Sequence, residues 1–167
     1  LRNRTIRSAA FESMGKDFGP TQKLKDYHVS VAKGGVGMTT LAYASINRSG
    51  VSFNSQLWLR DEIVPALKDI TDAIHAEGAA AGIQIGHCGN MTHWSTAGSF
   101  PVSASNGFNL YSPTFHRRMS HAEIAQTAKD FGKAVHTAHE AGFDSVEVHA
   151  GHGYLISQFL SPWTNRR

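Results

Sequence analysis

The sequence predicts an α/β protein built on a parallel β-sheet, and three observations support this fold class. Short apolar runs alternate with longer amphipathic stretches along the 167 residues. Glycine, proline or helix-capping residues stand at the boundaries between these stretches. A closed (β/α)8 barrel of about 250 residues uses roughly 31 residues per strand–helix unit, so the chain has room for four units and one long insertion. Because repeated alternation favours parallel strands joined by right-handed crossovers, we expect about half of a (β/α)8 barrel.

The first part of the chain predicts two strands with a helix between them. A short strand is expected over residues 5–10. The helix that follows carries Leu24 and Val31 on one face and ends at Gly34. Residues 36–46 predict the second strand, because valine, methionine, threonine and leucine follow one another with little polar alternation, as in a strand covered on both faces.

A second helix and a third strand are predicted in the middle of the chain. Apolar residues recur at helical spacing from Ile63 to Ile74, and Gly78 ends this helix. Residues 80–87 predict the third strand. The segment 89–119 is rich in glycine, serine, asparagine and proline and shows no clear period. It is too long for a plain connector, so we expect a long active-site loop.

The helix that precedes the fourth predicted strand has the clearest start signal in the sequence. Ser120 can accept a hydrogen bond from the Glu123 backbone while the Glu123 side chain reaches back, which is a capping box. The predicted helix ends at Gly142. Residues 144–149 predict the fourth strand, and residues 154–160 predict a short helix.

Composition and charge exclude several classes of protein. The 16 lysine and arginine residues outnumber the 13 acidic residues by 3, but they are spread along the chain in runs no longer than a pair. Nucleic-acid binding is therefore not expected. The single cysteine, Cys88, forms no internal disulfide and favours a cytoplasmic location. No apolar run approaches the roughly 18 residues of a membrane span, and no leader is expected. The chain begins at Leu1, so we expect one end to be missing.

The fourth predicted strand carries the most informative polar residues. Its alternation places Val146 and Val148 on the face toward the helices, and Glu147 and His149 on the face toward the barrel interior. His149 lies at the carboxyl end of the strand, where parallel α/β sheets bind ligands. We therefore expect a site at this edge of the sheet.

Two histidines and a tyrosine follow one another closely at this edge. His152 lies three positions after His149 in a glycine-flanked turn, and Tyr154 lies just beyond. Two imidazole N–H groups aimed at one oxygen would stabilise negative charge that develops there. A nearby tyrosine can supply a proton. The three side chains are candidate catalytic residues, although isolated histidines in a sequence with 10 of them are mostly structural.

A metal centre is the alternative for the same region. His87, Cys88, His149 and His152 offer nitrogen and sulfur ligands, but no pair has an established zinc spacing. Nucleophilic use of Cys88 is disfavoured because no basic residue lies beside it in sequence. The glycines of residues 34–37 precede a strand and so do not form a dinucleotide fingerprint.

One tryptophan of the long loop is a further candidate. Of the three tryptophans, Trp94 is the one that we expect to line a site, because it lies within 89–119.

The run AGFDSVEVHAGHGYLISQFLSP, residues 141–162, closely resembles the Old Yellow Enzyme family of FMN-dependent NADH:flavin oxidoreductases. Residues 1–4, 34–37 and 84–89 add to the resemblance, which extends over essentially the whole chain. It implies a TIM barrel, of which this chain is the N-terminal half with about the first four βα units. It also implies FMN at the carboxyl ends of the strands, with NADH or NADPH as reductant and an activated C=C bond of a small enone or enoyl compound as substrate.

The resemblance implies a role for each residue that matches the family pattern. His149 and His152 are expected to hold the substrate carbonyl oxygen, and Tyr154 is expected to donate the proton. Tyr43 is expected to touch the flavin through its backbone, and Gln84 to bond its pyrimidine edge. The residues expected to bind the flavin are Ser8, Ala9, Ala10, Phe11, Tyr43 and Gln84.

The sequence also departs from the family pattern. Ala9 and Ala10 stand where Pro-Met is common, Phe11 replaces a threonine or cysteine, and Asn90 replaces an arginine. The later units that supply the flavin-side arginine and the phosphate-binding loops are absent from the chain as written. We therefore keep two other hypotheses: a catalytically silent half-barrel that self-associates, and a metal-dependent TIM-barrel hydrolase.

Overall fold

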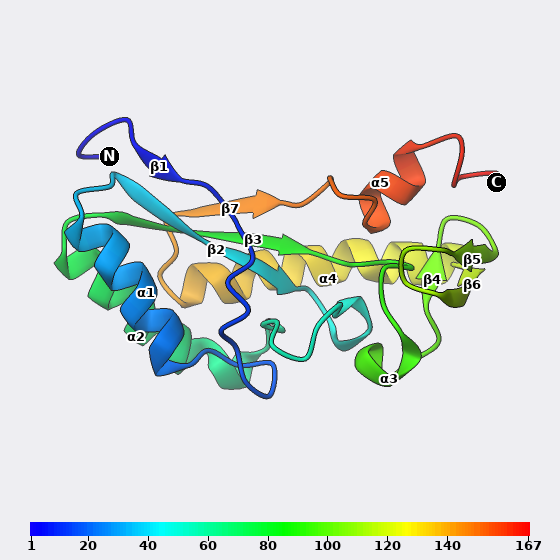
Figure 1. Cartoon of the computed structure of the whole chain (residues 1–167), viewed down its shortest axis with the longest axis horizontal. Helices are drawn as coiled ribbons and strands as arrows, with labels where there is room; N and C mark the ends of the chain where they lie inside the picture. Colours follow the sequence, from blue (N-terminus) through cyan, green and yellow to red (C-terminus); the bar gives the residue numbers. More distant parts are fainter.

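A computed structural model describes residues 1–167, and its centre is a sheet of four parallel strands with helices packed on one face (Figure 1). The strands lie in the order β1-β2-β3-β7. The strands are β1 (Ile6–Arg7), β2 (Met38–Ser45), β3 (Ala80–Gly86) and β7 (Ser145–Val148), and the long helices are α1 (Gln22–Lys33), α2 (Val64–Ala76) and α4 (His121–Glu140). The parallel sheet and the alternating helices confirm the predicted α/β class, while the count of barrel units stays a prediction.

The helices begin where the sequence places their capping residues. Thr21 accepts a hydrogen bond from the Leu24 backbone at the start of α1. Both bonds of the capping box between Ser120 and Glu123 are present at the start of α4. Each cap satisfies backbone N–H groups that a helix leaves unpaired at its first turn.

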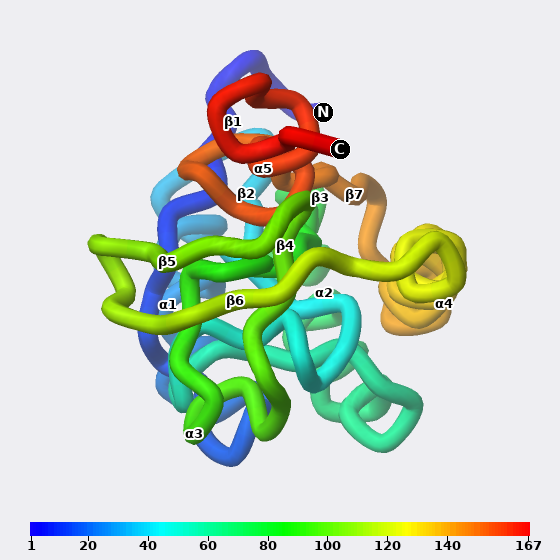
Figure 2. Tube along the Cα trace, turned by 90° about the vertical axis from the view of Figure 1, so that its right-hand side faces the viewer, coloured from blue at the N-terminus to red at the C-terminus, as the bar shows by residue number.

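The hydrophobic core lies between the sheet and the helices. Ile83 and Ile85 of β3 are fully buried, and they belong to the same cluster of 20 buried residues as Leu67 and Ile74 of α2. Figure 2 shows α1 and α2 beneath one part of the sheet and α4 beneath another. The helices therefore cover one face of the sheet, and the opposite face, which we call the open face, is left for polar side chains.

The strands are shorter than expected, most of all β1. The predicted strand at residues 5–10 pairs with β2 only at Ile6 and Arg7. Residues 8–12 leave the sheet, and the Ala42 backbone N–H of β2 donates to the Glu12 carboxylate instead of to a strand carbonyl. At the other edge, Val148 of β7 is 51% exposed, because β7 pairs with β3 on one side only and has no strand on its outer side. The sheet is open at both edges rather than closed into a barrel.

The segment 89–119 is more regular than the sequence predicts. It contains a short helix and a second sheet of three strands in the order β4-β6-β5, and this corrects the expectation of a long loop. Phe108 and Phe115 face each other across its hairpin, with ring centroids 5.0 Å apart. Strands of two to five residues are too short to show a period. The elements are α3 (Trp94–Ala97), β4 (Val102–Ser103), β5 (Gly107–Asn109) and β6 (Thr114–Arg118).

The remaining elements complete the carboxyl end of the sheet. All strands of the main sheet point toward this end, where the small sheet and α5 (Leu155–Leu160) lie (Figure 1). Two 3-10 helices, η1 (Arg48–Gly50) and η2 (Asp61–Ile63), lie between β2 and α2. No helix of the chain combines the length and the apolar character needed to cross a bilayer.

Removal of a core side chain from β3 should destabilise the fold strongly. We expect Ile83→Ala to lower the free energy of unfolding by roughly 2–5 kcal/mol, because the helices cannot close the cavity completely. Val135→Ala on α4 is the matched control, since Val135 is 42% exposed and its loss should change stability by less than about 0.5 kcal/mol. Urea denaturation followed by circular dichroism measures both. Equal losses in the two variants would contradict this placement of the core.

Candidate active site at the carboxyl end of the sheet

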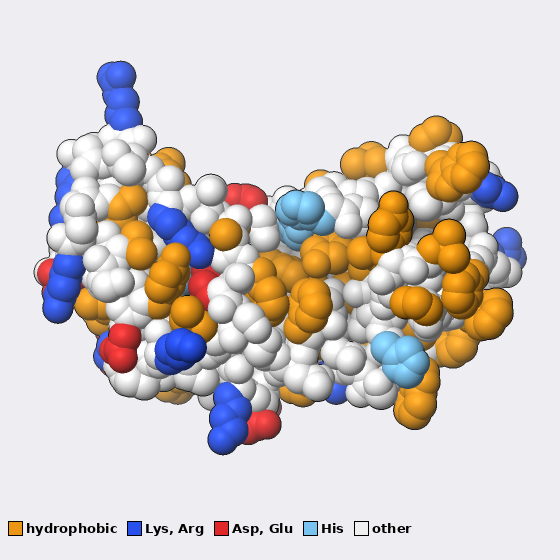
Figure 3. Space-filling model, in the orientation of Figure 1, with side chains coloured by type: hydrophobic (Ala, Val, Ile, Leu, Met, Phe, Trp, Pro, Cys, Tyr) orange, Lys and Arg blue, Asp and Glu red, His pale blue; other side chains and the backbone are white.

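The predicted site residues gather at the carboxyl end of the open face. His149 directly follows β7, and its backbone N–H donates to the carbonyl of Ile85 in β3. Tyr43 lies in β2 and Gln84 in β3. Figure 3 shows histidine and apolar side chains around a hollow on this side of the molecule.

The two histidines are in direct contact. His149 Nε2 lies 3.0 Å from His152 Nδ1, and the ring centroids are 4.9 Å apart. His152 has a φ of +57° and Gly153 has a φ of +71°. This left-handed backbone bends the chain sharply at the point where the His152 ring meets that of His149. The Tyr154 ring stands edge-on to His149 at 5.1 Å. The structure therefore brings the three candidate catalytic side chains together.

Tyr43 joins this cluster through its side chain. Its ring centroid lies 5.6 Å from that of His149 and 5.1 Å from that of Tyr154. Its hydroxyl lies 2.6 Å from Ser52 Oγ. Burial, followed by the neighbouring Tyr154, raises the pKa of Tyr43 far above its usual value, so the phenol stays protonated. The family resemblance implied only a backbone role for Tyr43. Its ring contacts and its bond to Ser52 were not predicted, because they form between different elements.

Gly86 explains how rings from two strands meet across β3. A Cβ atom at this position would lie 3.2 Å from His149 Cβ and 3.4 Å from the Tyr43 ring. A larger residue would therefore push the two side chains apart. Gly86 is a sequence signal for this close approach, since glycine within a strand often marks one.

The Gln84 side chain lies on the open face of the sheet, where it forms a hydrogen bond with a carboxylate. Its Nε2 donates to Glu147 Oε1 at 2.5 Å, and the two residues are direct partners in the β3–β7 register. Gln84 is 8% exposed. The alternation along the fourth strand placed Glu147 on this face, but its bond to Gln84 was not foreseen. The carboxylate fixes the amide, so that Nε2 points toward β7.

Residues 8–11 lead to the edge of the same cluster. Ala9 is half-buried, whereas Ser8 and Ala10 are exposed. Phe11 lies 6.1 Å from the Tyr43 ring and stacks on Phe53 at 5.1 Å. The aromatic wall of the site is the set Phe11, Phe53, Tyr43 and Tyr154.

The charge state of His149 is set by its surroundings. Burial lowers the pKa of His149, the neighbouring His152 lowers it further, and Glu147 opposes the change. His149 is therefore neutral at neutral pH, and one imidazole of the pair donates to the other. The two rings must move apart before both can donate to one substrate oxygen.

His87 and Cys88 serve the fold rather than this cluster. His87 is buried, and its Nδ1 accepts from the Gly89 backbone at 3.0 Å. Burial raises the pKa of Cys88 to about 12, so the thiol stays protonated and is a poor nucleophile. No group of three histidine, cysteine or acidic side chains comes close enough to hold a metal ion. The arrangement therefore gives the metal-centre hypothesis no support.

A cavity of about 670 Å³ opens beside the histidine turn. It lies between the small sheet and the last residues of the chain, and His152 forms part of its wall. Trp94 is not in this wall, although it was expected to line the site: it lies on α3 and is 61% exposed. Trp163 lines the cavity instead, together with Phe108, Tyr111, His116 and Gln158.

Comparison with known proteins places the chain among flavin enzymes. Residues 1–167 match the NADH:flavin oxidoreductase / NADH oxidase family. The chain belongs to this family. It is 35% identical to a 4,4'-dithiodibutanoate disulfide reductase of Rhodococcus erythropolis, with 100% of this chain and 41% of that protein covered. It is 37% identical to an NADPH dehydrogenase of Listeria welshimeri, and the match covers 100% of this chain and 49% of that protein.

A solved structure agrees with these sequence matches. The Old Yellow Enzyme homologue of Zymomonas mobilis superposes with a TM-score of 0.91 at 27% identity, covering 99% of this chain and 49% of that one. The chain thus spans about half the length of the relatives that it matches. The predicted resemblance to Old Yellow Enzymes is confirmed, and the cofactors of the family are FMN and NAD(P)H.

The residues present fit the ring system of FMN. An isoalloxazine ring offers two flat apolar faces and a pyrimidine edge of hydrogen-bond donors and acceptors. Phe11 and Tyr43 supply apolar aromatic surface, and the Gln84 amide supplies one hydrogen-bond donor and one acceptor on the open face of the sheet.

Stability should fall in mild acid because of His87. Burial lowers the pKa of His87 to about 4, whereas an unfolded histidine titrates near its ordinary value of 6.5. Between these values the unfolded chain binds more protons at this histidine. The contribution of His87 to the free energy of unfolding is therefore essentially constant above pH 7 and decreases as the pH falls from 6.5 toward 4. At pH 5 the loss due to His87 should be about 2 kcal/mol.

Urea denaturation at pH 7.5 and pH 5 measures this loss. His87→Gln should reduce the difference between the two pH values, whereas the control His136→Gln should not, because His136 is 70% exposed on α4. The assignment would be wrong if the wild-type chain and His87→Gln lost the same stability.

Proposed function

We propose that this chain carries the flavin-facing and substrate-facing residues of an FMN-dependent oxidoreductase of the ene-reductase type. The hydride would come from NAD(P)H by way of FMN and pass to the activated C=C bond of an enone or enoyl compound. The observation that supports this most strongly is the contact of His149, His152 and Tyr154 beside Gln84, at the carboxyl end of the strands, in a chain of this family.

FMN would be held by residues from three segments. Gln84 would bond the pyrimidine edge, Tyr43 would touch the ring, and Ser8, Ala9, Ala10 and Phe11 would lie beneath it. When bound, FMN supplies the hydride chemistry, which belongs to the cofactor. The protein supplies binding, orientation and electrostatics.

The histidine pair would bind the substrate carbonyl oxygen. As the hydride arrives, negative charge develops on this oxygen, and two N–H donors held in place stabilise it. The 3.0 Å contact between His149 and His152 supports this role, because it brings the two ring nitrogens close to each other. A substrate oxygen would replace the bond that the rings now make with each other.

Tyr154 would donate the proton to the α carbon. It stands at the N-cap position of α5, where a helix start fixes its backbone, and its ring is edge-on to His149. The Tyr43 ring lies 5.1 Å from that of Tyr154, but the bond of its hydroxyl to Ser52 and its burial would keep its phenol from exchanging a proton with substrate. Tyr154 is therefore the better donor of the two.

The cavity beside His152 suits a small-molecule substrate. Its volume of about 670 Å³ lies in the range of about 300–1,000 Å³ that is usual for ligand pockets. Its wall combines aromatic rings with amide and hydroxyl groups. The part of a substrate that extends away from the flavin would occupy this space.

Loss of either histidine should abolish most of the turnover. FMN is first titrated into the purified chain and its binding followed by the quenching of flavin fluorescence. Reduction of an enone under NAD(P)H is then measured. His149→Ala and His152→Ala should each lower the rate by about 10²–10³, the usual loss for one oxyanion donor, while FMN binding is unchanged.

His136→Ala is the matched control, because this exposed histidine on α4 is remote from the cluster. Its rate should equal that of the wild-type chain. The site assignment would fail if both His149→Ala and His152→Ala kept the wild-type rate.

A second candidate is a silent half-barrel that self-associates, and the open edge of β7 favours it. Val148 is 51% exposed and Leu160 is 73% exposed. Leu160 lines an apolar groove of about 250 Å³ between α4 and α5, together with residues such as Phe131 and Phe159. Unpaired strand edges and apolar surfaces of this kind promote association.

Sedimentation velocity tests this second candidate, because it measures whether the chain is a monomer or a dimer. A self-associating chain should sediment as a dimer, and Val148→Lys should convert it to a monomer because a charged edge strand resists pairing. Val135→Lys on α4 should leave the dimer intact. A monomeric wild-type chain would count against this candidate.

A further inference from the structure

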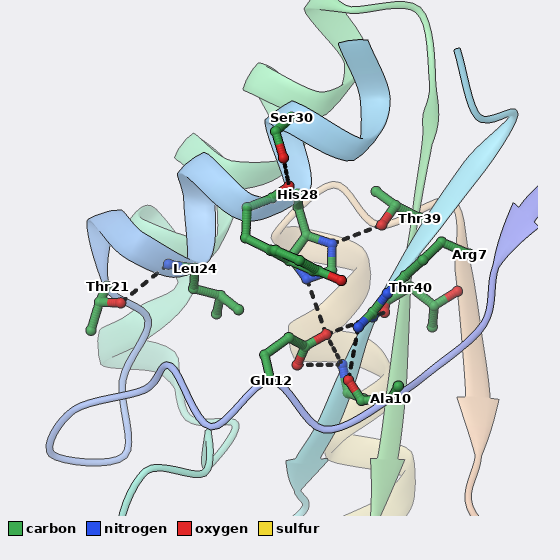
Figure 4. Close-up of polar contacts among 11 residues, drawn as sticks. Arg7, Ala10, Glu12, Thr21, Leu24, His28, Ser30, Thr39 and Thr40 are labelled. Carbon is green, nitrogen blue, oxygen red and sulfur yellow. Dashed lines mark hydrogen bonds and ion pairs between the residues drawn. The ribbon is translucent and has the colours of Figure 1, made fainter. Parts of the chain in front are cut away.

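A buried cluster of charged side chains lies behind the aromatic wall. Glu12 directly follows Phe11, and its side chain is 3% exposed. Arg7 Nη1 lies 2.6 Å from Glu12 Oε1, and His28 Nε2 lies 3.2 Å from the same oxygen. Figure 4 shows Arg7, Glu12 and His28 pointing toward one another from β1, the following loop and α1.

The Glu12 carboxylate takes the place of a missing strand carbonyl. β1 pairs with β2 only as far as Thr39. Beyond that point the Ala42 backbone N–H has no strand partner on this side, and it donates to both Glu12 oxygens at 3.3 Å each. A buried N–H group needs an acceptor, so Glu12 binds the loop to β2 where the pairing stops.

Arg7 ties the other side of Phe11 to the same strand. Its Nη1 donates to the carbonyl of Thr40 at 2.5 Å, and its Nη2 donates to the carbonyl of Ala10 at 2.9 Å. The residues on both sides of Phe11 are thus attached to one buried cluster.

His28 closes the cluster from the helix side. Its Nδ1 lies 2.8 Å from Thr39 Oγ1, and the imidazole is fully buried. His28 Nε2, which lies 3.2 Å from Glu12 Oε1, therefore borders the carboxylate from the α1 side.

Packing alone does not set the position of Phe11. Its side chain is 37% exposed, and its neighbours Phe53 and Tyr43 touch only part of it. The constraint on this segment comes from the buried charges instead, because a buried ion pair holds its partners in a narrow range of geometries.

We propose that Glu12 is a positioning residue that, with Arg7 and the Ala42 amide, holds residues 8–11 in the shape that faces the flavin. Glu12 touches neither flavin nor substrate in this arrangement and acts through Phe11 and Ala10. The proposal rests on the proposed function of the site, since it assigns a task to the support of the flavin-facing loop.

Substitution of Glu12 tests the proposal through FMN affinity and amide exchange. Glu12→Ala should raise the Kd of the chain for FMN by about tenfold or more, the effect of roughly one lost interaction. Deuterium exchange should become faster in residues 8–12 and at Ala42. Glu12→Gln should fall between Glu12→Ala and the wild-type chain, because its amide oxygen still accepts from Ala42.

Glu62→Ala is the matched control. This carboxylate is 78% exposed in η2 and has a partner only at 3.8 Å, so its loss should change neither FMN affinity nor exchange. Far-UV circular dichroism confirms that each variant is folded before FMN is added.

A double variant separates positioning from folding. Arg7→Met combined with Glu12→Leu replaces the buried pair by apolar side chains of similar volume, an exchange that usually preserves stability. The folded double variant should still bind FMN about tenfold or more weakly, because the loop has lost its attachment to β2.

The outcomes are distinct. The proposal is overturned if folded Glu12→Ala, or the folded double variant, binds FMN as tightly as Glu62→Ala does. The proposed function is then left intact. A wild-type chain that binds no FMN contradicts the proposed function, and the positioning proposal with it.

Discussion

The coverage of only one face of a parallel sheet by helices is the constraint on which the site depends. Because α1, α2 and α4 pack on one face, every second side chain of each strand points to the open face. Because the strands are parallel, their carboxyl ends meet at one edge. Tyr43, Gln84 and His149, from three different strands or strand ends, are neighbours for this reason alone. Gly86 then allows two rings to approach across β3.

The sequence predicted the elements of the main sheet but not their ends. Long apolar runs and capping residues mark the strands and helices, and they depend only on local sequence. The end of β1 depends on Glu12 and Arg7, whose side chains replace strand pairing, and no local pattern shows this. The strands within 89–119 are also set by distant pairing, as between Val102 and Arg117. Such short strands have no period to detect.

The site was predictable where one strand carries it and less so where several elements meet. His149 and His152 lie three positions apart, so strand alternation and one turn bring them together. The ring contact of Tyr43, its bond to Ser52 and the bond of Gln84 to Glu147 all cross between elements. Position within a loop was a poor guide to Trp94, because the segment folds into several short elements and α3, which carries Trp94, does not contribute to the cavity wall.

In the proposed chemistry, the imidazoles and the Tyr154 phenol have different tasks: the imidazoles stabilise charge and the phenol transfers a proton. Burial and the neighbouring His152 lower the pKa of His149, so its imidazole is neutral and donates a hydrogen bond rather than a proton. In the proposed reaction, the neutral His149 and its partner His152 would stabilise the developing charge on oxygen and leave proton transfer to Tyr154. Glu147 opposes the lowering of the His149 pKa. Its bond to Gln84 would therefore link the electrostatics of the proposed substrate site to the side chain proposed to bond the flavin.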